Sequence, residues 1–285
     1  MKFNGLIDCH THTSFSPDSE EPAINMIEKA ISLGLSAYAI TDHCECNRWY
    51  SMEHYGAKEN GYDTWDFNKD YERSVSFVTN MKEEYKGKLN LICGIELGQA
   101  THDYYIADKI AEDSRLDFII GSMHQLPNND DFAFIKYENY DYQGIMNLIE
   151  DYYKELYKLC CWGKFDVLGH VTYTLRYIEG NAGIKVDMSK FEDLIRECFK
   201  KLIESGKGIE INTSGLRQKY GKPFPHKEIL EIYKELGGEI LSLGSDAHCR
   251  EDLGKGIAEC AELAKQTGFK YITYFKNRKP EFLPL

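Results

Sequence analysis

The sequence contains no apolar run that approaches the roughly 18 residues a membrane-spanning helix needs. It also lacks a basic start followed by an apolar stretch, which is the pattern of a secretory signal peptide. The motif Asp8-Cys9-His10-Thr11-His12 comes so early that a cleaved leader would remove it. We therefore expect a soluble, cytoplasmic protein with no membrane partner, whose mature chain begins at or near Met1.

Positive charge is scarce, because 34 Lys and Arg residues face 46 Asp and Glu residues and leave a net charge of −12. Binding to a nucleic-acid backbone depends on concentrated Lys and Arg, so this balance argues against nucleic acid as the main partner. A small anionic substrate stays compatible if local cations or metal ions offset the field. The nine cysteines are odd in number, and a chain of 285 residues does not need disulfides for stability, so we expect reduced thiols.

No internal repeat, low-complexity segment or linker is visible, and the length suits an α/β barrel, so we expect one domain over residues 1–285. Short apolar or β-branched runs, each ending in polar residues, alternate with segments of helical periodicity. The predicted strands are residues 3–7, 37–41, 89–95, 118–122, 165–168, 208–211 and 240–243. The predicted helices are residues 22–33, 103–113, 142–159, 188–205, 226–236 and 254–267.

This alternation favours parallel strands joined by helical crossovers, and with no second domain boundary it predicts an α/β fold, a distorted seven-stranded TIM-like barrel. The carboxyl ends of barrel strands converge on one face, where such folds place their active sites. Two longer insertions, residues 44–67 and 126–141, are rich in Tyr, Trp, Phe, Asn and Asp. We interpret them as loops over that face.

Metal-binding residue types gather at the predicted strand ends. His10 and His12 flank one residue after the first strand, so their side chains point to the same side and can hold one ion. Five other predicted strands end in further candidate ligands: Asp42-His43, Glu96, His124, His170 and Asp246-Ala-His248. Six of the nine histidines thus fall on one predicted face. One ion takes about four ligands, so this many donors predicts a multinuclear site.

These motifs together resemble those of the polymerase and histidinol phosphatase (PHP) family of phosphoesterases. They occur in the family's order across nearly the whole chain: His10-Thr-His12, Thr41-Asp42-His43, Gly94-Ile-Glu96, Gly121-Ser-Met-His124, Gly169-His170 and Gly244-Ser-Asp246-Ala-His248. The resemblance implies a distorted seven-stranded barrel that carries up to three metal ions.

The resemblance also implies a ligand set for each ion. The first ion is expected on His10, His12, Glu96 and Asp246. The second is expected on Glu96, as a bridge, with His124 and His170. The third is expected on Asp18, His43 and His248. Asp18 stands six residues after His12, where some relatives carry His, and a turn or helix-start role in Ser16-Pro17-Asp18-Ser19 is its alternative.

The chemistry suits this ligand set apart from the resemblance. Neighbouring ions can share a water, lower its pKa toward neutrality, and hold the resulting hydroxide in line with a phosphorus atom. We therefore expect hydrolysis of a phosphomonoester without a covalent intermediate, with Glu96 and Asp246 in catalytic positions. Mixed imidazole and carboxylate donors predict two to three divalent ions, and they suit Zn, Fe or Mn.

Two arginines lie just past predicted strands, Arg176 and Arg217. A guanidinium group presents a planar fork of donors that matches phosphate, so both are candidates for substrate binding, and Arg217 also for catalysis. A rim salt bridge is the alternative for Arg176. The stretch Asn212-Thr-Ser-Gly-Leu-Arg217 is similar to the histidinol-phosphatase branch of the family, which implies hydrolysis of L-histidinol phosphate in histidine biosynthesis.

Two other functions stay open at this point. One is a phosphoesterase of the same fold that acts on nucleotides or nucleic-acid ends, and the other is a non-catalytic metal-binding regulatory module. The loop from Cys44-Glu45 to Trp65-Asp66 carries carboxylates and aromatic rings that would suit an aminoalkyl-imidazole substrate, or that pack as a lid on their own scaffold. The remaining histidines, His54, His102 and His226, are interpreted as ordinary loop or helix-start residues.

Overall fold

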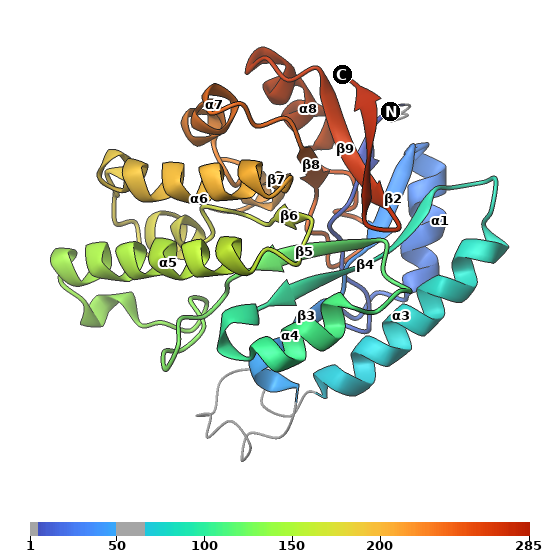
Figure 1. Ribbon diagram of the computed structural model, residues 1–285, viewed down its shortest axis with the longest axis horizontal. Coiled ribbons are helices and arrows are strands. Elements are labelled where there is room, and N and C mark those ends of the chain that lie inside the picture. Colours follow the sequence, from blue (N-terminus) through green and yellow to red (C-terminus); the bar gives the residue numbers. More distant parts are fainter. Residues whose placement is uncertain (1–4, 50–65) are drawn as a thin grey trace.

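The computed structural model describes residues 5–49 and 66–285, which are coloured along the chain in Figure 1. A parallel sheet forms its centre, in the order β1-β2-β4-β5-β6-β7-β8, with β3 paired to β4 as well. Its strands are β1 (Ile7–Asp8), β2 (Ala37–Ile40), β3 (His43–Glu45), β4 (Leu91–Gly98), β5 (Phe118–Ser122), β6 (Val167–Leu168), β7 (Gly208–Asn212) and β8 (Leu241–Gly244). Since β2 and β3 both pair with β4 and only Thr41 and Asp42 separate them, they act as one interrupted strand.

The first and last strands close the sheet into a barrel. The Cys9 N–H donates to the Leu243 carbonyl at 2.8 Å, and the Asp246 N–H donates to the His10 carbonyl at 2.7 Å. Thr11 then forms a parallel bridge with Ala247. The predicted seven-stranded barrel is therefore confirmed.

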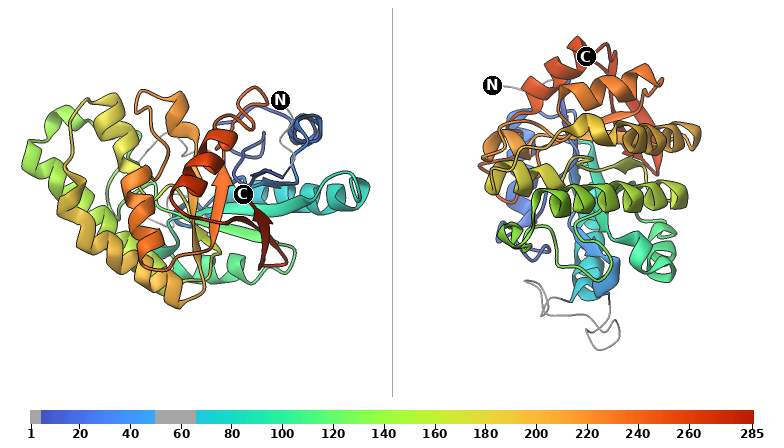
Figure 2. Two further views of the ribbon diagram at one scale, coloured as in Figure 1. Left: turned by 90° about the horizontal axis from the view of Figure 1, so that it is seen from above. Right: turned by 90° about the vertical axis from the view of Figure 1, so that its left-hand side faces the viewer.

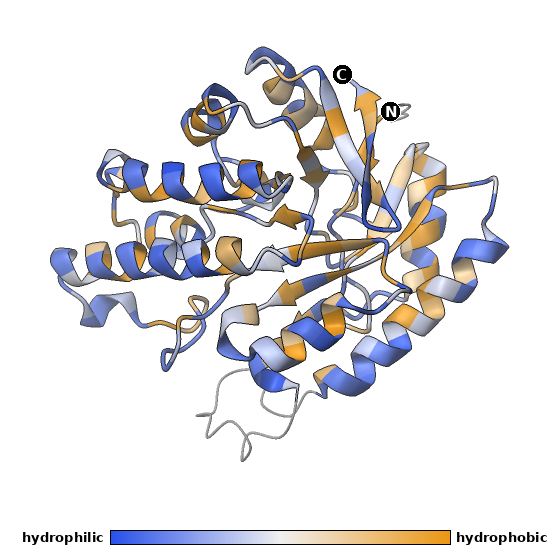
Figure 3. Cartoon of the chain, viewed as in Figure 1, coloured by the Kyte–Doolittle hydropathy of each residue, from blue (hydrophilic) through white to orange (hydrophobic). Residues whose placement is uncertain are grey.

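Helices cover the outside of the barrel, as the views in Figures 1 and 2 show. They are α1 (Ala23–Leu33), α3 (Phe67–Glu84), α4 (Tyr104–Ala111), α5 (Tyr142–Trp162), α6 (Glu192–Glu204), α7 (Lys227–Glu235) and α8 (Ile257–Gln266). Three begin at an aspartate whose side chain accepts a backbone N–H of the first turn: Asp66, Asp103 and Asp141. Their outward faces are hydrophilic while the strands are largely hydrophobic (Figure 3).

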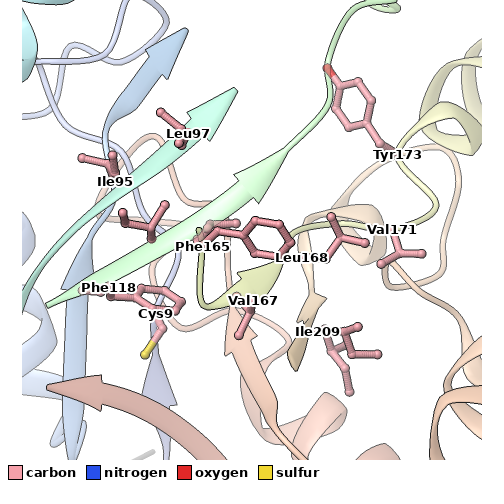
Figure 4. Packing of buried hydrophobic residues seen from close by; sticks show 14 of the residues in the cluster. Cys9, Ile95, Leu97, Phe118, Phe165, Val167, Leu168, Val171, Tyr173 and Ile209 are labelled. Carbon is pink, nitrogen blue, oxygen red and sulfur yellow. The ribbon is translucent and has the colours of Figure 1, made fainter. Parts of the chain in front are cut away.

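Buried side chains cover both faces of the sheet (Figure 4). Ile95 and Leu97 on β4 face the helices, whereas Phe118 on β5 and Val167 on β6 face the barrel interior, because Phe118 is in register with Gly94 and Val167 with Ile120. Because strand side chains alternate between the two faces of a sheet, Glu96 points to the face opposite Ile95 and Leu97, toward the barrel interior.

Some elements differ from the predictions. No helix was assigned after the insertion at residues 44–67, yet α3 begins at Phe67. That insertion was interpreted as a loop throughout, but it opens with β3 and a 3-10 helix (Cys46–Arg48), because pairing with β4 continues the second strand. The continuing pairs also extend β4 to Gly98, so Glu96 lies inside that strand rather than after it. Residues 50–65, including His54, lie outside the described residues.

The chain also continues beyond the last predicted helix. An antiparallel hairpin of β9 (Tyr271–Lys276) and β10 (Lys279–Pro284) follows α8 and was not predicted. Within the described residues, no helix combines the length and the apolar character needed to cross a bilayer. All nine cysteines lie in these residues and are free thiols there.

Barrel closure leaves no room for a side chain at Gly244, the last residue of β8. An added Cβ would lie 2.2 Å from the His10 Cβ and 2.3 Å from the Glu210 Oε1. We expect Gly244→Ala to lower the free energy of unfolding by about 1 to 3 kcal/mol, measured by denaturant titration. The control is Gly144→Ala in the first turn of α5, where an added Cβ meets its nearest atoms at 3.2 Å and the loss of stability should be smaller. Equal stability of the two variants would contradict this account of the seam.

Candidate metal centre

The predicted donors gather at the carboxyl ends of the barrel strands. They come from six places in the barrel, after β1, at β3, on β4, after β5, after β6 and after β8: His10, His12, His43, Glu96, His124, His170, Asp246 and His248. His10 and His12 are fully buried, whereas the other six line a pocket that opens to solvent. Asp18, from the loop after β1, lines the same pocket.

Glu96 lies at the centre of these side chains and is 1% exposed. Its Oε2 is within 3.5 Å of a ring nitrogen from each of three histidines, His10, His12 and His43. Its Oε1 is 2.6 Å from the His170 Nε2 and 3.1 Å from the His124 Nε2. The two carboxylate oxygens thus face two separate groups of imidazoles, which is the arrangement a bridging ligand needs.

Asp246 and Asp18 add carboxylates at the edge of this cluster. The Asp246 Oδ1 is 3.4 Å from the His12 Nε2 and 3.7 Å from the His248 Nδ1. The Asp18 Oδ2 is 3.0 Å from the His248 Nε2 and 3.6 Å from the His43 Nε2. Asp18 therefore faces the histidines expected to share its ion, although its segment also has the features of a turn.

The spacing of the donors fits metal ions. Among the described residues, four groups have ligand atoms within 4.8 Å of one another: His10, His12 and Glu96; Glu96, His124 and His170; His12, His43 and His248; and His43, Glu45 and His124. The first holds three of the four ligands expected for one ion, and the second is the set expected for another. The third has His12 where Asp18 was expected.

Ring nitrogens also face each other at short range, which supports a cation between them. The His10 and His12 Nε2 atoms are 3.1 Å apart, and the His124 and His170 Nε2 atoms are 3.3 Å apart. Two imidazole nitrogens so placed repel each other unless a proton or a metal ion lies between their lone pairs. Imidazole nitrogens with carboxylate oxygens form the donor set of Zn, Fe and Mn sites.

Two glutamates that support the cluster were not predicted as site residues. The Glu210 Oε1, on β7, is 2.7 Å from the His10 Nδ1, and its Oε2 accepts the His170 backbone N–H. The Glu45 Oε1, on β3, is 3.1 Å from the His124 Nδ1. Such partners fix the tautomer and the orientation of a ligating imidazole. The one signal in the sequence for Glu210 was a charged residue inside an apolar strand.

Burial and charge oppose each other in the cluster. Burial raises the pKa of the Glu96 carboxyl, but positive charge on His124 and His10 holds that pKa well below normal. Burial lowers the pKa of His124, yet the carboxylates of Glu96 and Glu45 raise it to about 10. Burial, with the charges of two neighbouring histidines, lowers the pKa of His12 to about 3. The buried carboxylates thus require compensating positive charge, which divalent ions would supply.

The two arginines occupy different positions. Arg176 lines the pocket, and its Nη2 donates to the Asp246 Oδ2 at 2.9 Å and to the Ser214 Oγ at 2.7 Å. Arg217 does not line this pocket as far as the described residues form it, and its Nη2 donates to the Ser245 and Asp246 carbonyls. Arg176 Nε and Arg217 Nη1 are buried with no hydrogen-bond partner in the described residues. Arg176 is thus the better placed of the two to meet a ligand.

Comparisons with known proteins agree with the motifs. The PHP domain model matches residues 8–214. The chain is 28% identical over 270 residues to the probable histidinol-phosphatase of Thermotoga maritima, covering 94% of each. It is 24% identical over 284 residues to the histidinol-phosphatase of Lactococcus lactis, covering 96% of this chain and 95% of that one.

Among solved structures, the fold is similar to histidinol phosphate phosphatase from Lactococcus lactis in complex with Zn, L-histidinol and phosphate. The TM-score is 0.75 at 22% identity, and the alignment covers 97% of this chain and 99% of that one. The family match ends at residue 214, so Asp246 and His248 lie beyond it although they face His12.

The central place of Glu96 leads to a prediction about metal content. Glu96→Gln removes the negative charge that faces both imidazole groups, so we expect bound metal to fall by about half or more. The measurement is elemental analysis of protein purified without chelator. The control is His226→Ala, because His226 is hydrogen-bonded to the Tyr220 hydroxyl at 3.1 Å and joins none of the described donor groups. Full metal content in Glu96→Gln, or metal loss in His226→Ala, would refute the assignment.

Proposed function

This chain belongs to the PHP domain family, and from that premise we propose that it is a metal-dependent phosphomonoesterase that hydrolyses L-histidinol phosphate to L-histidinol and phosphate. The observation that carries the proposal is the Glu96 carboxylate set between two groups of histidines, in a pocket that Arg176 also lines. The substrate assignment is supported by relatives named histidinol-phosphatase that match over nearly the full length of the chain.

We assign the proposed ligands as the resemblance to the PHP family implied them. His10, His12, Glu96 and Asp246 would hold one ion, Glu96, His124 and His170 a second, and Asp18, His43 and His248 a third. Bound there, two to three ions of Zn, Fe or Mn would neutralise phosphate charge and lower the pKa of a shared water. Glu45 was not in that set, but its oxygen lies close enough to His43 and His124 to contribute a ligand as well.

In this proposal, Arg176 and Arg217 bind and orient the phosphate group of the substrate. Asp246 and Ser214 fix one nitrogen of Arg176, while its buried Nε has no hydrogen-bond partner among the described residues and would donate to a phosphate oxygen that enters the pocket. The Tyr173 ring lies 5.2 Å from the Arg176 guanidinium and restricts it further. Arg217 is proposed as a second phosphate ligand. Its Nη2 holds the carbonyls of Ser245 and Asp246, and its buried Nη1, which has no partner among the described residues, would have to turn toward the pocket to meet a phosphate oxygen.

We also propose the binding partner, location and domain organisation of the protein. The partner is a small phosphomonoester, and neither nucleic acid nor a membrane is involved. A cytoplasmic location follows, because a charged phosphoester does not cross a bilayer unaided and must be hydrolysed where it is made. One domain over residues 1–285 is supported by the closure of β1 against β8, which joins segments from residue 7 to residue 247 in one barrel.

The ligand sets predict a metal stoichiometry. Protein purified without chelator should contain about two to three equivalents of divalent metal per chain, since Glu96 faces two donor groups and Asp18 faces another. Removing the metal with a chelator should abolish phosphate release, and adding Zn, Fe or Mn back should restore it. Fully active protein with one equivalent or less would rule out a multinuclear centre.

A phosphate-release assay tests the function. Histidinol phosphate should be turned over with a higher kcat/KM than an aryl phosphate, a nucleoside bisphosphate or the ends of single-stranded DNA. A preference for the nucleotide substrates would replace this proposal with the nucleotide-directed alternative. A complete lack of phosphatase activity in metal-loaded protein would favour a regulatory role.

The arginine roles predict a ranked set of variants. Arg176→Ala and Arg217→Ala should each lower kcat/KM for histidinol phosphate, with a loss on the order of 2 to 4 kcal/mol for a phosphate ligand. The Lys variants should recover only part of it, because lysine keeps the charge but not the fork. Arg250→Ala, which changes an exposed arginine, is the control. Unchanged kinetics with intact metal content in either Ala variant would remove that arginine from the phosphate site.

A further inference from the structure

The pocket at the metal centre has two unlike sides. On the side of β6 and β8, Arg176 lies against Asp246 and supplies positive charge. On the side of β4 and β5, the lining residues beyond the metal donors include Gln99, Gln125 and Asp131, which supply amide groups and a carboxylate. Arg48, in the 3-10 helix after β3, lines the pocket as well but has an interaction partner of its own. A ligand with an anionic group at one end and nitrogen-bearing groups at the other would match this polarity.

Gln99 has features of a ligand contact. It follows the end of β4, is 2% exposed and lines the pocket. Its Oε1 is buried and accepts no hydrogen bond within the described part of the chain, which is costly for a polar atom unless a ligand or water meets it. Its φ of 53° is also unfavourable for a residue with a side chain. A buried acceptor in a strained conformation at a pocket wall points to an N–H donor on the ligand.

Asp131 is held over the same pocket by the loop after β5. Its Oδ1 accepts the Ala133 N–H at 2.8 Å, and its main chain forms an antiparallel bridge with Gln125. Gln125 is itself fixed, since its Oε1 accepts from the Asn47 Nδ2 at 3.1 Å and its Nε2 donates to the Asn129 carbonyl. The carboxylate is therefore positioned by a network rather than by a free loop.

The electrostatic setting of Asp131 favours a cationic ligand. Burial raises the pKa of its carboxyl to about 6, although positive charge on His124 lowers it. A carboxylate with reduced access to water gains more from an incoming cation than one on the open surface.

We propose that Gln99 and Asp131 recognise the nitrogen-bearing end of the substrate, with Asp131 pairing with its ammonium group and the Gln99 Oε1 accepting an N–H. This inference rests on the proposed function and assigns its specificity. The pocket would accept phosphomonoesters of cationic amino alcohols, with the phosphate toward Arg176 and the amine toward Asp131. A phosphomonoester without an amine, such as an aryl phosphate, would make neither contact. It would gain binding free energy only from its phosphate group.

The test compares substrates rather than rates alone. Asp131→Asn keeps the size of the side chain and removes its charge, while Asp130→Asn makes the same change on an exposed neighbour. Gln99→Asn withdraws the acceptor by one methylene, and asparagine tolerates the left-handed backbone at this position. The readout is the ratio of kcat/KM for histidinol phosphate to kcat/KM for an aryl phosphate.

We expect this ratio to fall about 10- to 100-fold in Asp131→Asn and in Gln99→Asn, as loss of a charge-assisted hydrogen bond implies, and to stay at the wild-type value in Asp130→Asn. Calorimetric titration with L-histidinol, which has no phosphate, should show weaker binding in the first two variants, whereas binding of inorganic phosphate should hold. The second measurement separates recognition from a general loss of folding.

The outcomes separate the inference from the function it rests on. Wild-type ratios and wild-type L-histidinol binding in both variants would overturn the inference and leave the proposed function intact. A wild-type enzyme without preference for histidinol phosphate over the aryl phosphate would overturn both. An equal fall in Asp130→Asn and Asp131→Asn would also refute the inference, because the effect would then be one of net charge.

Discussion

The Glu96 carboxylate among histidine rings is the interaction on which the site depends. It is 1% exposed, and a charge taken out of water is tolerated only where opposite charge and hydrogen bonds compensate it. Five imidazoles approach its two oxygens, and Glu210 and Glu45 hold some of those rings from behind. The protein thus gathers a surplus of buried donors around one point, which is the electrostatic condition for holding several cations close together.

The closure of the barrel is what brings these donors into one place. His10 and His12 follow the first strand and Asp246 and His248 follow the last, yet backbone hydrogen bonds across the β1–β8 seam set them side by side. Asp246 and His248 lie beyond residue 214, where the match to the family model ends. The hydrogen bonds of the β1–β8 seam are what place them beside His10 and His12. Packing at Gly244 and the metal binding proposed for His10 are therefore linked, because an added Cβ at Gly244 would press on His10.

The parts of this architecture that obey a local rule could be predicted from the sequence. Apolar runs ending in His, Asp or Glu gave the strands and the candidate ligands, since strand ends in a barrel share one face. What could not be predicted was set by contacts between distant segments. Glu45 was missed as a site residue because β3, the strand that contains it, has no apolar run by which the sequence could predict a strand. Asp131 lies in the insertion 126–141, which was interpreted as a loop over this face, but nothing singled it out within that loop. Gln99 gave no signal, because glutamine is common in loops and only the fold brings it to the pocket.

Backbone strain falls where these segments meet. Gln99, His170 and Asp246 have φ values of 53°, 21° and 54°, and each lies just past the carboxyl end of a different strand. A residue with a side chain in this region costs on the order of 1 to 3 kcal/mol and persists only where surrounding contacts over-determine it. Those contacts are present, since Glu210 accepts the His170 N–H and the His10 carbonyl accepts the Asp246 N–H. The closed barrel is therefore rigid enough to keep these residues, at the carboxyl ends of its strands, in backbone conformations that a flexible loop would not retain.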